Sequence, residues 1–152
     1  MGPRHSRLAA ALAAAWEAEV VSARRLSSFA ERCADGTARA KLLVLSAFSR
    51  AHASRILARL AALGRGPLPV PPQEESEGAP DDLLTALRRE VTLCRVAASR
   101  YEAMAELARS MSDLSSAWVC ELNRTEEEDL VLDLARLVER GITDRDESVA
   151  GG

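Results

Sequence analysis

Residues 64–80 read GRGPLPVPPQEESEGAP and contain five of the six prolines of the chain. Proline lacks a backbone N–H and fixes its φ angle, so this segment cannot continue a helix. Proline-rich chain stays extended at about 3.1 Å per residue, which gives the segment a reach of roughly 50 Å. A helix of about 28 residues is about 42 Å long. The segment is therefore long enough to run the full length of a helical bundle, although it would also serve as a hinge between two separate helical hairpins.

Both flanks of this segment have the composition and periodicity of long helices. The chain of 152 residues contains 28 Ala and 21 Leu, which favour helices, but only 10 Val and 2 Ile, which favour strands. Apolar residues recur at spacings of three and four, and turn or capping residues interrupt this pattern at Asp35-Gly36, Gly64, Asp81-Asp82 and Ser112-Asp113. We therefore expect helices over residues 6–34, 37–63, 81–110 and 113–140.

The lengths of the connections predict how these helices are arranged. The first and second helices are joined by only a few residues, as are the third and fourth, and such short loops make each pair an antiparallel hairpin. With residues 64–80 as a long crossover between the hairpins, the sequence predicts an all-α four-helix bundle that forms one domain over residues 1–140. We expect residues 141–152 to be a flexible tail, or alternatively a docking peptide for a larger assembly.

Charge divides the chain into two unlike halves. Residues 1–71 carry a net charge of +7 and residues 72–152 a net charge of −10, which indicates two oppositely charged hairpins packed together. Five aromatic residues are too few for a surface that stacks nucleic-acid bases, and no apolar stretch reaches the ~18 residues that span a bilayer. The three cysteines lie at unrelated spacings, which is typical of free thiols in a reducing cytosol. We therefore expect a cytoplasmic protein without nucleic-acid or membrane partners.

Polar residues interrupt the apolar seams of the expected helices near their middles. Glu19 does so in the first helix and His52 in the second, while Glu126 and Asp129 share a face of the fourth. The register that turns Glu127 and Leu130 inward is a competing one, because residues 126–129 form a run of four acids. Buried carboxylates are normally paired or bound to a metal. Since carboxylates and imidazole are ligands of iron, manganese and zinc, the pattern predicts a metal site in mid-bundle.

These residues resemble the di-iron motifs of ferritin-like four-helix bundles, the superfamily that includes bacterioferritins and rubrerythrins. In that pattern, single glutamates on two helices combine with Glu-x-x-His motifs on the other two. The stretches that carry the resemblance are Glu19 to Leu26, Ser49 to His52, Cys94 to Tyr101, and Glu126 to Asp129. The intervals of 33 residues from Glu19 to His52 and 32 residues from Cys94 to Glu126 are similar, as expected for two hairpins in one register.

The chain departs from this family pattern at three of the six ligand positions. Ser49 stands where a bridging glutamate is expected, Cys94 replaces the glutamate of the third helix, and Asp129 replaces the histidine of the fourth. A serine hydroxyl does not hold two cations together, so the resemblance implies no normal di-iron centre. It implies either no metal or one Fe, Mn or Zn ion, held by Glu19, His52 and Glu126 with Tyr101 as a neighbouring donor. Cys94 is alternatively a small buried residue of the core.

Two functions are compatible with this pattern. A divergent ferritin-like protein that has lost its di-iron centre would act as an interaction or scaffold bundle, with a protein partner. The alternative is an oxidoreductase or iron-handling protein that uses a single metal ion. Because ferritin-like bundles often pair, the resemblance also implies a homo-oligomer, either a dimer or something larger.

Overall fold

The computed structural model describes residues 2–73 and 81–145, and it confirms the all-α four-helix bundle. The helices are α1 (Pro3–Arg32), α2 (Gly36–Ala62), α3 (Leu83–Ser110) and α4 (Leu114–Glu139), each within a few residues of its expected bounds. Helix α1 begins three residues earlier than expected, at Pro3. Proline suits the first position of a helix because its missing N–H would have no intrahelical partner there.

Aspartate side chains begin three of the four helices. Asp35 accepts a hydrogen bond from the backbone N–H of Thr37, and Asp82 accepts one from Thr85. Asp113 accepts one from the N–H of Ser116 at the start of α4. These bonds satisfy donors that lack a partner inside the first helical turn. Gly64 and Gly141 follow α2 and α4 with φ angles of +79° and +65°, which glycine adopts without the penalty that other residues incur.

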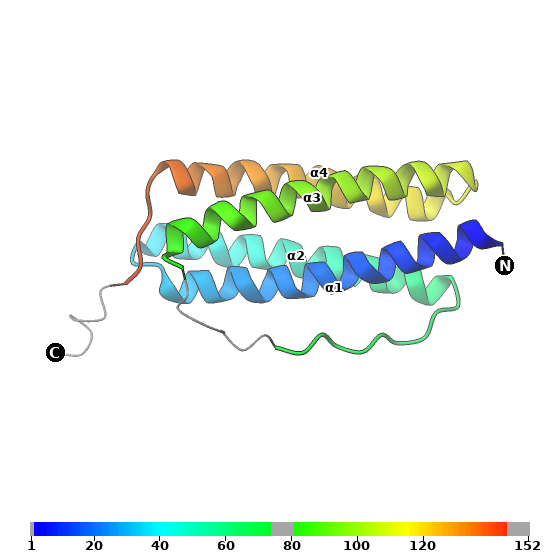
Figure 1. Cartoon of the computed structure of the whole chain (residues 1–152), viewed down its shortest axis with the longest axis horizontal. Helices are drawn as coiled ribbons and strands as arrows, with labels where there is room; N and C mark the ends of the chain where they lie inside the picture. Colours follow the sequence, from blue (N-terminus) through cyan, green and yellow to red (C-terminus); the bar gives the residue numbers. More distant parts are fainter. Residues whose placement is uncertain (1, 74–80, 146–152) are drawn as a thin grey trace.

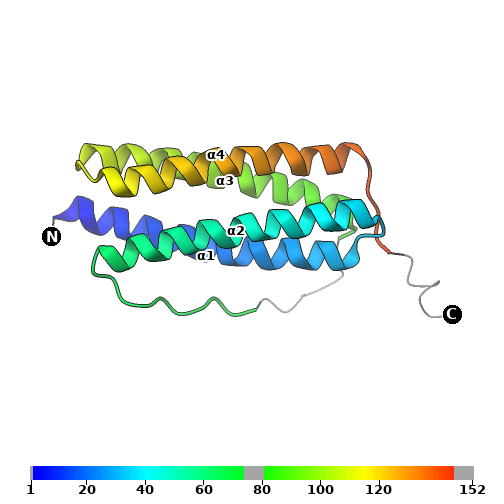
Figure 2. The same ribbon diagram turned by 180° about the vertical axis from the view of Figure 1, so that it is seen from behind.

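The helices form two antiparallel hairpins, α1 with α2 and α3 with α4, that lie against each other along their whole length (Figures 1 and 2). The start of the crossover, residues 64–73, runs back along the hairpin of α1 and α2 (Figure 1). Arg24 holds it there, because its guanidinium donates to the carbonyl oxygens of Pro71 and Pro72 at 2.7 and 3.3 Å. Residues 74–80, the remainder of the expected crossover, lie outside the described residues.

The apolar core is divided into two clusters by a band of polar side chains. One cluster, with Leu26, Leu42 and Leu134, lies toward the turn between α1 and α2. The other, with Leu12 and Ile56, lies toward the opposite end of the bundle. Between them are fully or almost fully buried polar residues from all four helices, namely Glu19, Ser22, Ser49, His52, Glu90, Asn123 and Glu127. The interrupted seams of the sequence therefore correspond to one polar layer inside the bundle.

The segment after α4 is packed where the sequence led us to expect a flexible tail. Ile142 is buried, and the carbonyl of Thr143 accepts a hydrogen bond from the N–H of Ala34. Asp144 accepts hydrogen bonds from the N–H of Leu83 and from Nε of Arg32, both at 2.9 Å. These contacts attach residues 142–145 to the turn between α1 and α2 and to the start of α3. Residues 146–152, where a docking peptide was considered, lie outside the described residues.

We expect Asp144→Ala to lower the free energy of unfolding by about 1–2 kcal/mol, because it removes the side-chain bond to a helix N-terminus and one ion pair. Urea denaturation followed by circular dichroism measures this loss. Glu17→Ala is a suitable control, since Glu17 is exposed and has no ion pair within the described part of the chain. An exposed site of this kind should change stability by no more than about 0.5 kcal/mol. Equal effects of the two variants would contradict an anchoring role for Asp144.

Candidate metal centre

Three helices bring two carboxylates to one edge of a buried imidazole. Glu19 comes from α1, His52 from α2 and Glu127 from α4, and each is at most 2% exposed. His52 Nδ1 lies 3.0 Å from Glu19 Oε2 and 3.1 Å from Glu127 Oε2. One donor atom from each of the three residues lies within 4.8 Å of the other two. Within the described residues, this is the only group of three or more His, Cys, Asp or Glu side chains with such an arrangement.

The opposite edge of the His52 ring is held by a second set of side chains. Nε2 of His52 lies 3.1 Å from Glu126 Oε1, and Arg55 donates to the same carboxylate at 2.6 Å. Asn123 donates from Nδ2 to the backbone carbonyl of His52 at 3.3 Å and accepts a hydrogen bond from Arg55. These contacts fix both the position and the plane of the imidazole ring.

The expected register of α4 is wrong by one residue. Asp129 is exposed and Glu126 is only partly buried, whereas Glu127 and Leu130 point into the core. The buried positions of this helix include Ser116, Cys120, Asn123, Glu127, Leu130, Leu134 and Leu137, at spacings of three and four. Because the polar residues Ser116 and Asn123 belong to this inward stripe, the apolar residues of this helix indicate a stripe that is one position off. The competing register with Glu127 and Leu130 inward is the one adopted.

Electrostatics in the centre reflect burial and close pairing. Burial alone would lower the pKa of His52, but the close approach of the Glu127 and Glu19 carboxylates to Nδ1 outweighs this effect and raises the pKa to about 9. Burial raises the pKa of Glu19 to about 7, despite the opposing bond to His52. Burial would also raise the pKa of Glu126, but the hydrogen bond from Arg55 lowers it below its usual range. Near neutral pH, therefore, the imidazole carries a proton that the neighbouring carboxylates stabilise.

The other residues singled out in the sequence border this centre. Ser49 and Tyr101 are buried, and within the described part of the chain their hydroxyls have no hydrogen-bond partner of standard geometry. The ring of Tyr101 lies edge-on to His52, with 6.4 Å between ring centroids. Burial and nearby carboxylates, Glu127 foremost, raise the pKa of the Cys94 thiol far above its usual value. Cys94 is thus a neutral thiol near Glu127 in the absence of a metal.

A third buried carboxylate lies next to the centre and was not predicted from the sequence. Glu90 of α3 accepts a hydrogen bond from Ser22 Oγ at 2.8 Å and pairs with Arg25 Nε at 2.7 Å. It lies one helical turn before Cys94 and three residues after Leu87, so its spacing from these seam positions could have indicated burial. A cavity of about 400 Å³ between α1 and α3 is lined by Glu90, Cys94, Glu19 and Glu127, and it leads to the carboxylates of the centre.

The donor set fits one metal ion. Nitrogen and oxygen ligands of Zn²⁺ lie about 2.0–2.2 Å from the ion, so two ligands of one ion are separated by roughly 3–4 Å. Each of the two carboxylates already approaches Nδ1 of His52 to this degree, and the three donor atoms all lie within 4.8 Å of one another. Glu127 Oε2 and the Tyr101 hydroxyl are buried without a hydrogen-bond partner of standard geometry among the described residues, which leaves polar atoms of the centre available to a ligand. Glu126 contacts the opposite edge of the ring, at Nε2. It therefore cannot be a ligand of an ion that is bound to Nδ1.

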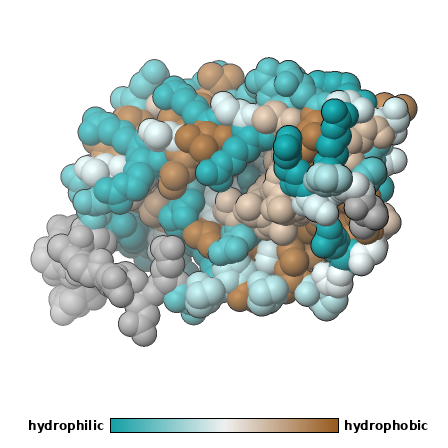
Figure 3. All heavy atoms as spheres, turned by 45° about the vertical axis from the view of Figure 1, so that its right-hand side comes forward, coloured by the Kyte–Doolittle hydropathy of each residue, from teal (hydrophilic) through white to brown (hydrophobic). Residues whose placement is uncertain are grey.

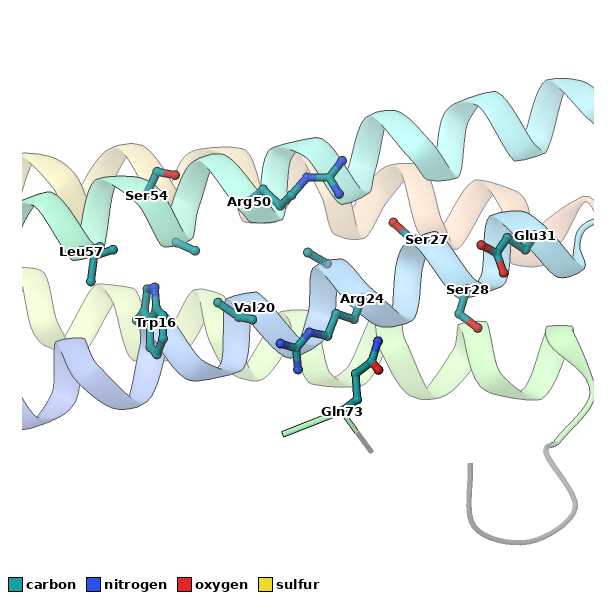
Figure 4. A pocket seen from close by; sticks show the side chains of 12 residues that line it. Trp16, Val20, Arg24, Ser27, Ser28, Glu31, Arg50, Ser54, Leu57 and Gln73 are labelled. Carbon is teal, nitrogen blue, oxygen red and sulfur yellow. The ribbon is translucent and has the colours of Figure 1, made fainter. Parts of the chain in front are cut away.

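A separate groove of about 670 Å³ lies on the outer side of α1 and α2 and does not include the centre (Figure 4). Trp16, Val20 and Leu57 lie toward one end of it, and Ser28 and Glu31 toward the other. On the face seen in Figure 3, hydrophobic side chains are interspersed with hydrophilic ones. None of the described helices combines the length with the apolar character that crossing a membrane requires.

Comparison with known proteins identifies the fold. No protein-family model matches the chain, and neither does any curated protein. Among solved structures, a ferritin-like di-iron-carboxylate protein from Bacillus anthracis is 16% identical with a TM-score of 0.78, covering 91% of this chain and 99% of its own. An archaeal Dps homologue from Halobacterium salinarum is 18% identical with a TM-score of 0.79, covering 89% and 81%. The bacterioferritin of Rhodobacter capsulatus is 20% identical with a TM-score of 0.73, covering 88% and 84%.

These likenesses confirm the resemblance stated from the sequence at the level of the fold. The chain has the ferritin-like four-helix-bundle architecture, including the long connection between the second and third helices. Its buried Glu-His-Glu group could hold a metal ion.

Proposed function

We propose that this ferritin-like bundle binds a single transition metal ion, Fe, Mn or Zn, through Glu19, Glu127 and Nδ1 of His52. The observation that carries the proposal is the approach of two buried carboxylates to the same ring nitrogen. Two carboxylates and one imidazole are a ligand set found for each of these metals. A di-iron centre needs additional bridging carboxylates, and Ser49 and the exposed Asp129 do not supply them.

Glu126 has a different role in this proposal from the one expected. Its carboxylate lies 3.1 Å from Nε2 of His52, so it would accept the Nε2–H bond and keep that proton in place when a metal displaces the proton from Nδ1. Metal-bound histidines commonly donate their second N–H to a carboxylate in this way. Arg55 holds Glu126 in place and keeps it ionised. The group formed by Arg55, Glu126 and Asn123 would thus orient the histidine ligand.

A bound iron or manganese ion would supply one-electron chemistry toward dioxygen or peroxide. The chain's own contribution would be to fix the charge at the site through Glu19 and Glu127 and to exclude bulk water through the two apolar clusters. Tyr101, whose ring lies edge-on to His52, would present its hydroxyl to the centre. The cavity between α1 and α3 would provide room for a small reactant near the two carboxylates.

A second candidate is a metal-free interaction or scaffold bundle. The observation that favours it is that the charges of the centre compensate each other. A protonated His52 pairs with the carboxylates of Glu19 and Glu127, so no metal ion is needed to balance them. Ser49 and Cys94, both buried, then act as core residues.

Metal stoichiometry distinguishes the two candidates. Titration of the metal-free protein with Co²⁺, followed by its visible absorption, should saturate at about one ion per chain if the proposed site exists. Elemental analysis after growth with added iron and manganese should give no more than that ratio. Two ions per chain would contradict a single site. No binding of Co²⁺, Fe²⁺ or Zn²⁺ at millimolar concentration would favour the scaffold.

A further inference from the structure

The proposed metal ligands come from α1, α2 and α4, so α3 is the one helix of the bundle that contributes none of them. Helix α3 lies beside α1 (Figure 1). The cavity of about 400 Å³ between these two helices is lined at once by Glu19 and Glu127 of the centre and by residues of α3. Two of the lining side chains from α3, Glu90 and Cys94, carry an atom that can bind a metal. Helix α3 is thus placed to add a donor to the centre.

Glu90 is not available as that donor, because other side chains already occupy both of its carboxylate oxygens. Oε1 accepts a hydrogen bond from Ser22 Oγ at 2.8 Å, and Oε2 accepts one from Arg25 Nε at 2.7 Å. Cys94 lies one helical turn further along α3 and is 2% exposed. The pKa of its thiol is raised by burial and, among its neighbours, most strongly by the carboxylate of Glu127, so the two side chains are close to each other. Cys94 is therefore the candidate donor of α3.

The carboxylate beside Cys94 has a buried oxygen without a partner. Glu127 is 1% exposed, and its Oε2 atom lies 3.1 Å from His52 Nδ1. This atom has no hydrogen bond of standard geometry among the residues that the structure describes. Leaving a buried anionic oxygen without a donor costs free energy. The oxygen is thus an indication of a bound cation that is independent of the cysteine, at the place where the thiol meets the centre.

We propose that the thiolate of Cys94 is a fourth ligand of the single metal ion, and that this ligand makes the site selective for Zn²⁺ over Mn²⁺ and Fe²⁺. The inference rests on the single-metal site already proposed and names the metal that this site takes. Thiolate is a soft ligand that favours zinc, whereas carboxylate ligands alone suit manganese. One thiolate, one imidazole and two carboxylates are donor types that Zn²⁺ binds, and four ligands complete the tetrahedral geometry that it prefers.

The thiol reaches the ion by a small movement. Sγ of Cys94 is not among the three donor atoms that lie within 4.8 Å of one another, so the side chain turns about its Cα–Cβ bond when the metal binds. The cavity next to Cys94 leaves room for this turn. The thiol proton is released to solvent as the metal–sulfur bond forms. Arg25 and Arg100 also line the cavity, and their positive charge lies near the three anionic ligands.

The absorption spectrum of the Co²⁺ protein tests the thiolate ligand directly. Co²⁺ replaces Zn²⁺ in such sites, and a thiolate bound to it produces an intense charge-transfer band in the near ultraviolet. We expect the wild-type protein to show this band together with the visible bands of Co²⁺, both saturating at about one ion per chain. Cys94→Ser should lose the charge-transfer band but retain visible bands at higher Co²⁺ concentration.

Competition between metals measures the selectivity. In Cys94→Ser, the affinity for Zn²⁺ should fall by at least about tenfold, whereas the affinity for Mn²⁺ should change by less than about threefold. Cys94→Ala, which introduces no hydroxyl, should show the same loss of Zn²⁺ affinity. Circular dichroism should show the same helix content for all variants, so that a change in affinity reports on the ligand.

Cys33→Ser is a matched control, because Cys33 is also a fully buried free cysteine. It lies 14 residues beyond Glu19 in the chain, which corresponds to about 21 Å along a helix. This variant should keep the charge-transfer band and both affinities of the wild-type protein. A charge-transfer band that Cys33→Ser removes, or that Cys94→Ser retains, would overturn the assignment of the thiolate to Cys94.

Two negative results have different meanings. If Co²⁺ binds at about one ion per chain without the charge-transfer band, the thiolate ligand is overturned but the single-metal site stands. The same holds if Cys94→Ser binds Zn²⁺ as tightly as the wild-type protein does. If the wild-type protein binds no Co²⁺ and no Zn²⁺, the single-metal site itself fails and the thiolate ligand with it.

Discussion

Glu127→Gln is expected to weaken metal binding by more than about 100-fold, because it removes one of two anionic ligands without changing the shape of the side chain. Glu19→Gln should have an effect of the same size. Both side chains approach His52 Nδ1, and both are buried away from solvent that could replace them. Competition between the protein and a coloured chelator for Zn²⁺ or Co²⁺ measures the change in affinity.

The ranking of four variants separates the proposed ligand set from the one expected from the sequence. Glu126→Gln retains an acceptor for the Nε2–H of His52 but loses the charge, so it should weaken binding by about 10- to 100-fold. Asp129→Asn should have no effect on the affinity, because Asp129 is exposed. A larger loss from Glu126→Gln than from Glu127→Gln would contradict the proposed ligand set and restore Glu126 as the ligand.

Each substituted protein must remain folded for this comparison to be valid. Glutamine has nearly the volume of glutamate, so the polar layer keeps its packing. His52 in Glu127→Gln still has Glu19 and Glu126 within 3.1 Å of its ring nitrogens. Thermal melts of the metal-free variants should therefore show one cooperative transition. Loss of metal binding with an intact transition then reports on the ligand and not on the fold.

The fold could be predicted from the sequence because its determinants are local. The proline-rich crossover excludes an ordinary up-and-down bundle, and Asp35, Asp82 and Asp113 begin helices by bonds to residues two or three positions ahead. The ordered segment 142–145 could not be predicted in this way. Its attachment depends on Asp144 reaching Arg32 and Leu83, which are more than 60 residues away in the chain.

The polar centre could be predicted only in part. Glu19 and His52 interrupt apolar seams, and their burial follows from that pattern. Which acid of residues 126–129 points inward depends on the rotation of α4, and four consecutive acids give no local signal for it. The rotation is fixed by the packing of Asn123, whose side chain bonds to the backbone of His52 across the bundle. Glu90 was missed for the same reason, because Ser22 and Arg25, its partners, lie on another helix.

The metal-free protein is expected to lose stability as the pH rises from about 6 to about 9. His52 has a pKa of about 9 in the folded state and of 6.5 in the unfolded chain, so its stabilising contribution is complete below pH 6.5 and is lost as the pH rises through 9. Glu19 acts in the same direction, because its folded pKa of about 7 exceeds the unfolded value of 4.5, and ionising it in the folded state is unfavourable. The His52 contribution is on the order of 3 kcal/mol.

Such a loss corresponds to a melting temperature roughly 10 °C lower at pH 9 than at pH 6. Differential scanning calorimetry of the metal-free protein measures it directly. His52→Gln removes the imidazolium, so the curve of this variant should be nearly flat above pH 7. A wild-type melting temperature that is constant or rises over this range would show that the imidazole does not hold its proton in the folded state.

A bound metal should reverse this dependence on pH. Metal and proton compete for Nδ1 of His52 and for the Glu19 carboxylate, so the affinity increases as the pH rises and the protons are released more easily. Binding stabilises the folded state in proportion to the logarithm of the ratio of free metal to the dissociation constant. With excess Zn²⁺, the increase in melting temperature should therefore be larger at pH 8 than at pH 6. Opposite pH trends with and without metal, both lost in His52→Gln, would locate metal and proton at the same nitrogen, whereas a metal effect independent of pH would place the ion elsewhere.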